Sequence, residues 1–160
     1  RFRYEIFDKN NNEYNRIEIL KEILLDKNIQ SYAWNKLYKK ELFDEIKYPI
    51  GKKYEDIGTT FYLLEKCNKV VVTGKSEYYY INRQDSIVNN VTESTITDYI
   101  ELIMQRYDYI EKNIKELSSY NKDYLKRILK TAEKDIKSLN EVGDYTKKKY
   151  EELYNKVQKF

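Results

Sequence analysis

The chain has 160 residues, of which 41% are apolar and 36% charged, and its net charge is only +3. This length and apolar content suit one folded domain and exclude a disordered chain. The absence of His excludes His-based acid–base catalysis and His metal sites, and the single Cys67 excludes an internal disulfide and a Cys zinc site.

The first part of the chain mixes strand and helix signals. Residues 2–7 alternate between apolar and polar positions, which predicts a short strand, and the polar segment 8–15 predicts a loop. Apolar residues at three-and-four spacing predict an amphipathic helix over 14–27. Residues 30–38 mix aromatic and apolar positions and predict a strand, which runs into a short helical segment, 39–46.

The next segment contains the main break in the chain. Residues 47–53, "KYPIGKK", hold the only proline and one of four glycines. A helix is predicted over 55–67, with one apolar stripe. Two β-branched or aromatic runs within 68–82, on either side of the turn 73–76, predict a hairpin-like pair of strands.

The C-terminal part has a helical pattern throughout. Apolar residues repeat at alternating threes and fours over 96–117, 125–139 and 150–160. We expect three helices that pack as a bundle on the mixed part, although helices that bind a membrane surface or a partner remain an alternative. The predicted fold class is α+β, with a mixed part at 1–90 and an all-helical region at 91–160.

Several absences narrow the class of protein further. Acidic residues interleave with the lysines, so we expect no nucleic-acid binding. No apolar run approaches the ~20 residues that cross a bilayer, and we expect no signal peptide. We expect a buried Cys67 thiol and a cytoplasmic location, where thiols stay reduced. Because the first residue is Arg1 rather than Met, we expect a fragment or a processed chain.

An acidic pair, Glu55-Asp56, stands at the start of the helix predicted over 55–67. One interpretation is structural, because an acid near a helix N-terminus contributes about 0.5–1 kcal/mol. The other is a general base, which must lie within reach of the hydroxyl group that it deprotonates. One carboxylate can cap the helix while its neighbour faces a cleft, so both interpretations stay open at this point.

Three segments resemble a known family. They are "WNKLYKKELF" at 34–43, "YEDIGTTFYLL" at 54–64 and "YYYINRQDSI" at 78–87. Together, in this order and spacing, they resemble the C-terminal half of family 2 GT-A glycosyltransferases of bacterial capsule, exopolysaccharide and teichoic-acid assembly. The resemblance covers about residues 2–120, and it implies a partial GT-A-like fold of a few short strands and helices.

The resemblance implies roles for five residues. Asp56 would be the catalytic base, which takes a proton from the acceptor sugar hydroxyl in an inverting transfer from a nucleotide sugar. Glu55 would orient the substrate or cap the helix, and Arg83 would contact the leaving diphosphate. Trp34 would stack on a sugar ring and Lys36 would supply a cation. The structural alternatives are a surface Arg83, a packed Trp34 and a solvated Lys36.

The chain departs from the family in lacking two motifs. It has no Asp-x-Asp motif and no glycine-rich phosphate loop around its four glycines. We therefore expect no metal or nucleotide site in this fragment, and Mg²⁺ or Mn²⁺ only in the full-length enzyme. Without its donor-binding half, the chain should be inactive.

The expected partners follow from the resemblance. They are a nucleotide sugar, mainly through the absent half, and a glycan or lipid-linked acceptor in cell-surface polysaccharide synthesis. We also expect self-association of the fragment and peripheral contact with the inner face of the membrane. The alternative function is a non-enzymatic helical module that binds a protein or a membrane surface.

Overall fold

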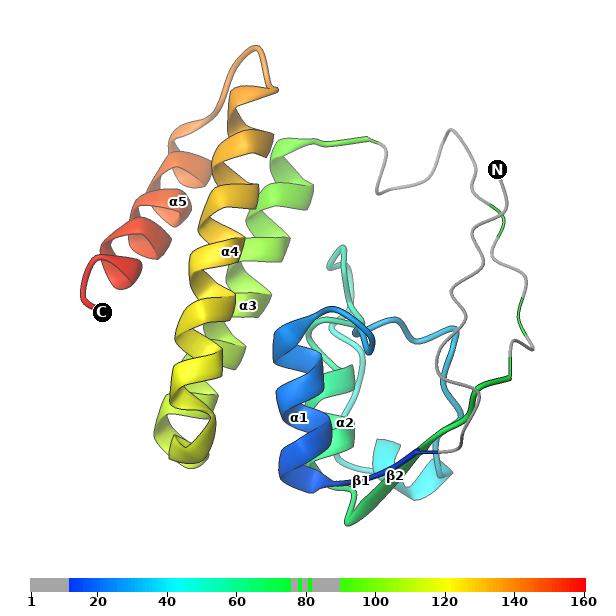
Figure 1. The fold of residues 1–160 in the computed structure, drawn as a ribbon. Coiled ribbons are helices and arrows are strands. Elements are labelled where there is room, and N and C mark those ends of the chain that lie inside the picture. Colours follow the sequence, from blue (N-terminus) through cyan, green and yellow to red (C-terminus); the bar gives the residue numbers. More distant parts are fainter. Residues whose placement is uncertain (1–11, 76–77, 79–80, 82–89) are drawn as a thin grey trace.

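The computed structural model describes residues 12–75, 78, 81 and 90–160 (Figure 1). It is an α+β protein, as predicted, and it is mostly helical. In chain order its elements are β1 (Asn12–Asn15), α1 (Arg16–Leu25), the 3₁₀ turn η1 (Lys40–Phe43), α2 (Thr60–Glu65), β2 (Lys69–Val72), α3 (Glu93–Asn113), the 3₁₀ turn η3 (Lys115–Leu117), α4 (Ser118–Lys137) and α5 (Asp144–Val157).

Helix α1 confirms the helix predicted over 14–27, with slightly narrower bounds. A capping box starts it: the Asn15 side chain accepts the Glu18 amide at 3.0 Å, and the Glu18 carboxylate accepts the Asn15 amide at 2.9 Å. It ends at Asp26, whose φ of 55° places it in the left-handed region. Its apolar side is buried and comprises Ile19, Leu20, Ile23 and Leu24.

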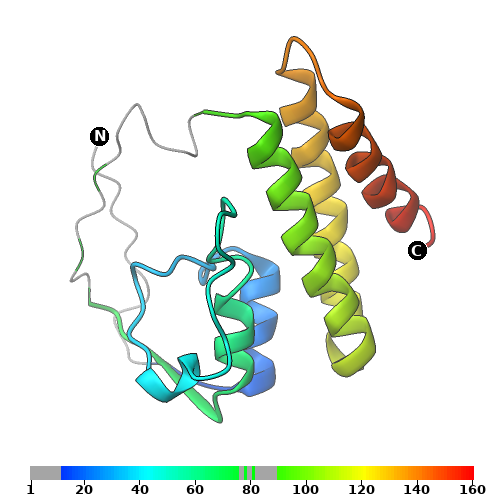
Figure 2. The ribbon, with the colours of Figure 1, turned by 180° about the vertical axis from the view of Figure 1, so that it is seen from behind.

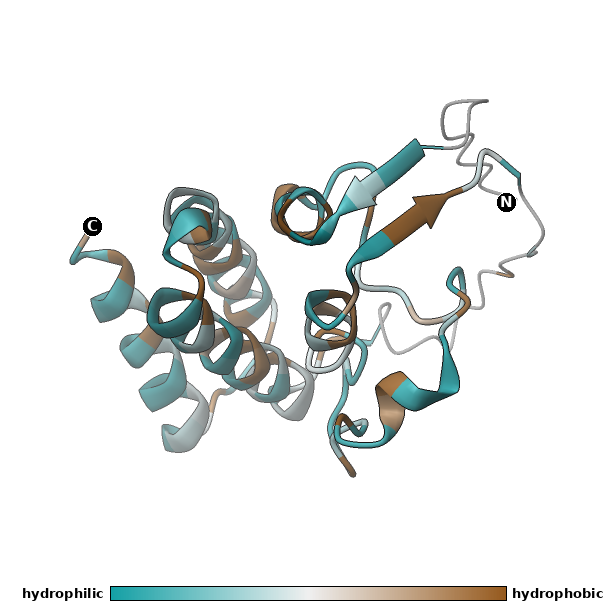
Figure 3. Ribbon diagram, turned by 90° about the horizontal axis from the view of Figure 1, so that it is seen from below, coloured by the Kyte–Doolittle hydropathy of each residue, from teal (hydrophilic) through white to brown (hydrophobic). Residues whose placement is uncertain are grey.

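The two described strands form one antiparallel pair, in which Asn12 lies opposite Val72 and Asn15 opposite Lys69. The loop predicted over 8–15 is therefore wrong from Asn12 onward. The asparagines are typical of loops, but burial alternates along this segment, and Tyr14 packs against the core. Figure 3 shows the contrast between the apolar β2 and the polar β1. The strand predicted at 2–7 and most of the second half of the predicted hairpin lie outside the described residues.

The strand predicted over 30–38 is wrong, because this segment is irregular and contains a turn. The main-chain carbonyls of Gln30 and Tyr32 accept hydrogen bonds from the side chain of Lys36, both at 2.6 Å, rather than from a neighbouring strand. The short helical segment predicted next is confirmed as η1. The helix predicted over 55–67 is confirmed in part, because α2 begins only at Thr60.

The three predicted C-terminal helices are confirmed as α3, α4 and α5, which lie side by side as a bundle (Figures 1 and 2). Helix α1 packs on α4 and η3, so one hydrophobic core joins the mixed part to the bundle. Ile110 is fully buried, whereas Ile136, which the apolar pattern also places inside, is only partly buried. None of the described helices is both long and apolar enough to cross a membrane. The boundary between 1–90 and 91–160 stays a prediction.

The core contains a buried cation, Arg106 of α3, which is only 1% exposed. Within the described residues, its Nη1 and Nη2 atoms have no hydrogen-bond partner. Its guanidinium lies over the rings of Tyr124, at 4.5 Å, and Phe61, at 5.7 Å. Cation–π attraction, which strengthens when the pair is desolvated, stabilises the charge there and links α2, α3 and α4.

Cys67 follows α2 and is half-buried rather than fully buried as predicted. Its thiol donates to the carbonyl of Leu63 at 3.3 Å, and burial raises its pKa. Because a protonated thiol is a poor nucleophile, the raised pKa does not favour a catalytic role for Cys67.

Candidate functional site

The acidic pair lies in a turn that precedes α2 and is not part of the helix. The main-chain oxygen of Asp56 accepts the amide of Thr60 at 2.8 Å and that of Thr59 at 3.2 Å, so the peptide of Asp56 starts the first turn of α2. The N-cap residue is Thr59, and no side chain caps the helix there. The capping interpretation of Glu55 and Asp56 therefore has no hydrogen bond at the N-cap to support it.

The two acids have different surroundings. Glu55 is exposed, whereas Asp56 is half-buried. Burial raises the pKa of Asp56, and the charge of Glu55 raises it further, while the amide of Ile57 and the charge of Lys36 lower it. A half-buried carboxyl group with a raised pKa is an arrangement that general bases use, because it holds a proton more readily than a free carboxylate does.

The charges of Lys36 and Asp56 act on one another, so the structure brings these two predicted site residues into the same region. Its ammonium donates to the carbonyls of Gln30 and Tyr32, at 2.6 Å each, and to the side chain of Asn35 at 2.7 Å. All three of its protons are thus used within its own loop. Burial lowers the pKa of Lys36 to about 8, and the Asp56 charge acts in the opposite direction. Lys36 therefore shapes the loop and contributes charge, but it offers no spare donor.

Trp34 belongs to an aromatic column on the surface. Its ring stacks on Tyr32 at 5.4 Å and 19°, and on Tyr78 at 5.0 Å and 29°. Trp34 is 38% exposed and Tyr78 is 56% exposed, so the column is partly open to solvent. Large rings with an apolar face and a polar edge are common at binding surfaces, because they combine contact area with hydrogen bonding. The structure thus places Trp34 in a surface column, outside the buried core.

Two tyrosines near Asp56 were missed by sequence reasoning. Burial raises the pKa of Tyr38 to about 12, and the Asp56 charge adds to this effect. The pKa of Tyr48 is raised by burial and then by Asp56 and Glu55. The Tyr38 hydroxyl lies 3.4 Å from that of Thr60. Both tyrosines stay protonated at neutral pH and are potential hydrogen-bond donors. The position of Tyr38 in the motif segment 34–43 was a signal, but 18 tyrosines in the chain made it easy to overlook, and Tyr48, in the break at 47–53, had no such signal.

The described structure does not test two predictions about the site. Arg83 lies outside the described residues. Within the described ranges, no group of three or more His, Cys, Asp or Glu residues is arranged to hold a metal ion. The absence of a metal site from this fragment, and the Mg²⁺ or Mn²⁺ expected in the full-length enzyme, both stay predictions.

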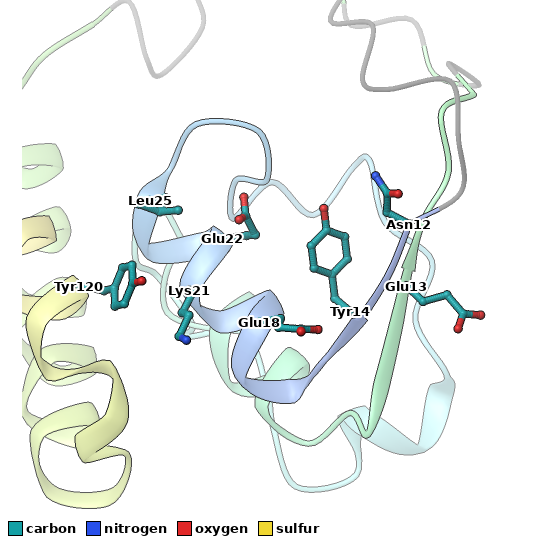
Figure 4. Close-up of a pocket in the computed structure, with 8 residues that line it drawn as sticks. All are labelled: Asn12, Glu13, Tyr14, Glu18, Lys21, Glu22, Leu25 and Tyr120. Carbon is teal, nitrogen blue, oxygen red and sulfur yellow. The ribbon is translucent and has the colours of Figure 1, made fainter.

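A pocket of about 520 Å³ lies elsewhere, between β1, α1 and Tyr120 of α4 (Figure 4). Three of its lining residues are acidic, but two of them have structural partners. Glu18 completes the capping box of α1, and Glu13 pairs with Lys69 at 2.5 Å. Trp34, Lys36, Glu55 and Asp56, the predicted site residues that the structure describes, do not line this pocket, so it is not a candidate for the predicted chemistry.

Comparison with curated proteins finds one named a glycosyltransferase. The chain is 30% identical over 99 residues to glycosyltransferase GlyA of Streptococcus pneumoniae serotype 4, a match that covers 58% of this chain and 14% of that protein. The chain thus spans a small part of the length of this relative. No family model and no solved structure matches. The similarity supports a relationship to a glycosyltransferase.

Proposed function

We propose that the chain is the C-terminal, acceptor-side part of an inverting family 2 glycosyltransferase with a GT-A fold. The longer enzyme would transfer a sugar from a nucleotide sugar to a glycan or lipid-linked acceptor in bacterial cell-surface polysaccharide synthesis. The observation that carries the proposal is Asp56, a half-buried carboxyl group with a raised pKa in the segment that resembles the family. The similarity to GlyA adds independent support.

Asp56 would act as the general base. Its carboxylate takes the proton from an acceptor hydroxyl as the oxygen attacks the anomeric carbon of the donor sugar. The bond from that carbon to the nucleoside diphosphate breaks in the same step, and the diphosphate leaves with the bonding electrons. A base contributes about 10²–10⁴-fold to such a step when it lies within hydrogen-bond reach of the hydroxyl.

The neighbours of Asp56 would have supporting roles. The Tyr32–Trp34–Tyr78 column supplies aromatic surface for the acceptor sugar, and Lys36 holds the loop that carries Trp34. Glu55 remains in our proposal as the acid that orients the substrate. Arg83 would contact the leaving diphosphate. The nucleotide and a Mg²⁺ or Mn²⁺ ion would bind mainly to another part of the full-length enzyme.

The setting of the enzyme is also part of the proposal. We place it in the cytoplasm, in peripheral contact with the inner face of the membrane. The 160-residue chain alone would be inactive and would self-associate. The decisive experiment uses the full-length protein: nucleotide sugars are screened for acceptor-dependent diphosphate release with Mg²⁺ or Mn²⁺. Release that Asp56→Asn abolishes would support the proposal, and full release by this variant would overturn it.

A further inference from the structure

The turn that carries Asp56 is fastened to helix α3 by polar contacts. The ammonium of Lys52 donates to Asp98 at 2.8 Å and to Glu101 at 2.7 Å. The second oxygen of Asp98 accepts the main-chain amide of Lys53 at 2.9 Å. Asp98 is only 9% exposed, and both of its carboxylate oxygens are used. The bond to the Lys53 amide fixes the backbone three residues before Asp56.

Apolar contacts fasten the same turn to the same face of α3. Tyr54 has a φ of 57°, and its ring meets Tyr99 edge-on at 5.2 Å. At Gly58, an added Cβ atom would lie 2.7 Å from the side chain of Leu102 and 3.3 Å from that of Pro49. The main chain on both sides of Asp56 therefore contacts α3 directly. The contacts are at Asp98 and Leu102, which are one helical turn apart.

We propose that Asp98 is a positioning residue for the Asp56 base, holding the backbone at Lys53 so that the carboxyl group meets the acceptor hydroxyl. This inference rests on the function proposed above. A reacting group displaced by about 1 Å can lose about 10²-fold in rate, so an anchor this close to the base affects the reaction directly. In this proposal, helix α3 of the C-terminal bundle positions the base, although Asp98 itself touches no substrate.

A carboxylate that only stabilises the fold should affect the melting temperature and not kcat. The chain offers such a carboxylate as a matched control. Glu93, also on α3, accepts the amide of Gly143 at 2.8 Å and the hydroxyl of Thr146 at 3.0 Å. This carboxylate, like Asp98, binds one main-chain amide and one side chain. It ties α3 to the start of α5 and makes no hydrogen bond to the turn around Asp56.

The experiment compares Asp98→Asn with Glu93→Gln in the full-length protein. Asp98→Asn should lower kcat by about 10- to 100-fold and leave the KM for the nucleotide sugar within about twofold. Glu93→Gln should keep the wild-type kcat, even if both variants lower the melting temperature by the same amount. Equal kcat values for the two variants would overturn the proposal.

The pH profile supplies a second readout, which a loss of stability alone would not move. Burial is the largest cause of the raised pKa of Asp56, so releasing the turn toward water should lower that pKa. The base then stays deprotonated at lower pH, and the acidic limb of kcat/KM moves to lower pH in Asp98→Asn. All the other ionisable groups that interact with Asp56 are kept in this variant: Lys36, Tyr38, Tyr48, Tyr54 and Glu55.

The outcomes separate this proposal from the proposed function. If Asp56→Asn is inactive while Asp98→Asn keeps the wild-type kcat and acidic limb, the positioning role is overturned and the function stands. Full activity of Asp56→Asn overturns both. Should Asp98→Asn fail to fold, Lys52→Met removes only the side-chain half of the anchor and should lower kcat in the same direction. Hydrogen exchange in the 160-residue chain adds a readout that does not depend on activity. The Lys53 amide should exchange at least about tenfold faster in Asp98→Asn than in the wild type, and its exchange rate should be unchanged in Glu93→Gln.

Discussion

The ammonium of Lys36 and the carboxyl group of Asp56 come from two different loops, and each changes the pKa of the other. The cation lowers the pKa of Asp56, and the acid raises that of Lys36. Burial outweighs this attraction at both groups, so the net shifts run the other way: Asp56 upward and Lys36 downward to about 8. Each group is therefore closer to changing its charge near neutral pH than it would be in water.

The first prediction concerns Asp56 in the full-length enzyme. Asp56→Asn should lower transfer by about 10²–10⁴-fold, because the base is lost. The melting temperature and the affinity for nucleotide should hardly change. Glu55→Gln, a change of the exposed neighbour, is the control and should keep substantial activity. Near-normal turnover in Asp56→Asn together with a lower melting temperature would instead mean that the acid is structural.

The second prediction uses Lys36 to shift the pH profile. Lys36→Met removes the cation that lowers the pKa of Asp56, so that pKa should rise. Because the base must be deprotonated, the acidic limb of kcat/KM should move to higher pH, opposite to the direction expected for Asp98→Asn. An acidic limb in the same place as in the wild type would show that Lys36 and Asp56 are not coupled.

The third prediction concerns the stability of the 160-residue chain against pH. The pKa of Lys36 is about 8 in the folded protein and 10.5 as an ordinary lysine. Between these values the unfolded chain binds more protons, so the Lys36 contribution to the free energy of unfolding rises with pH. Urea denaturation of the wild type and Lys36→Met should therefore show a difference that changes between about pH 8 and 10.5, in favour of the wild type as pH rises. A difference that stays constant would contradict it.

The fourth prediction tests how the bundle packs. Ile110 is fully buried, so Ile110→Asp should cost about 3–5 kcal/mol through an unpaired buried charge. Ile136→Asp should cost less, because Ile136 is only partly buried. Gln105→Asp, on the exposed side of α3, is the control. Thermal melts measure the effect, and liposome flotation measures the alternative: an Ile110→Asp variant that stays folded but loses liposome binding would mean that the helix lies on membranes.

The fifth prediction concerns self-association of the isolated chain. Leu37 and Ile50 are completely exposed, and Val71 of β2 is half-exposed. Exposed apolar surface of this kind drives association in water. Light scattering should show a mass that rises with concentration, and the double change Leu37→Ser and Ile50→Ser should weaken this rise. A monomeric mass over a wide concentration range would be evidence against the prediction.

Elements with a clear pattern in their own segment could be predicted from the sequence. Helix α1 has the capping pair Asn15 and Glu18, and the bundle helices repeat apolar residues at helical spacing, so each element could be recognised within its own segment. The strand β1 could not be recognised, because its asparagines are typical of loops and its partner β2 is distant in the sequence. The irregular segment around Trp34 was missed because one lysine side chain takes up its main-chain carbonyls.

Residues of the candidate site could be predicted only where they lie in one of the three motif segments. Trp34, Lys36 and Asp56 came from segments that resemble a family, and the proximity of Asp56 to Tyr38 and Tyr48 required the folded chain. Asp98 had no signal, since it looks like an ordinary acid in an amphipathic helix. Contacts between residues so far apart follow from packing and leave no local pattern.

The bond between Lys53 and Asp98 has a consequence for the order of events during synthesis, because it spans 45 residues of chain. Translation at about 5–20 residues per second makes α3 several seconds after the turn that it holds. Until then the segment around Asp56 has no partner for its Lys53 amide, however well α1 and α2 have formed. The rate of translation thus sets the interval before the Asp56 carboxyl group acquires its fixed geometry. In a nascent chain stalled before α3 is made, the Lys53 amide would exchange freely with solvent.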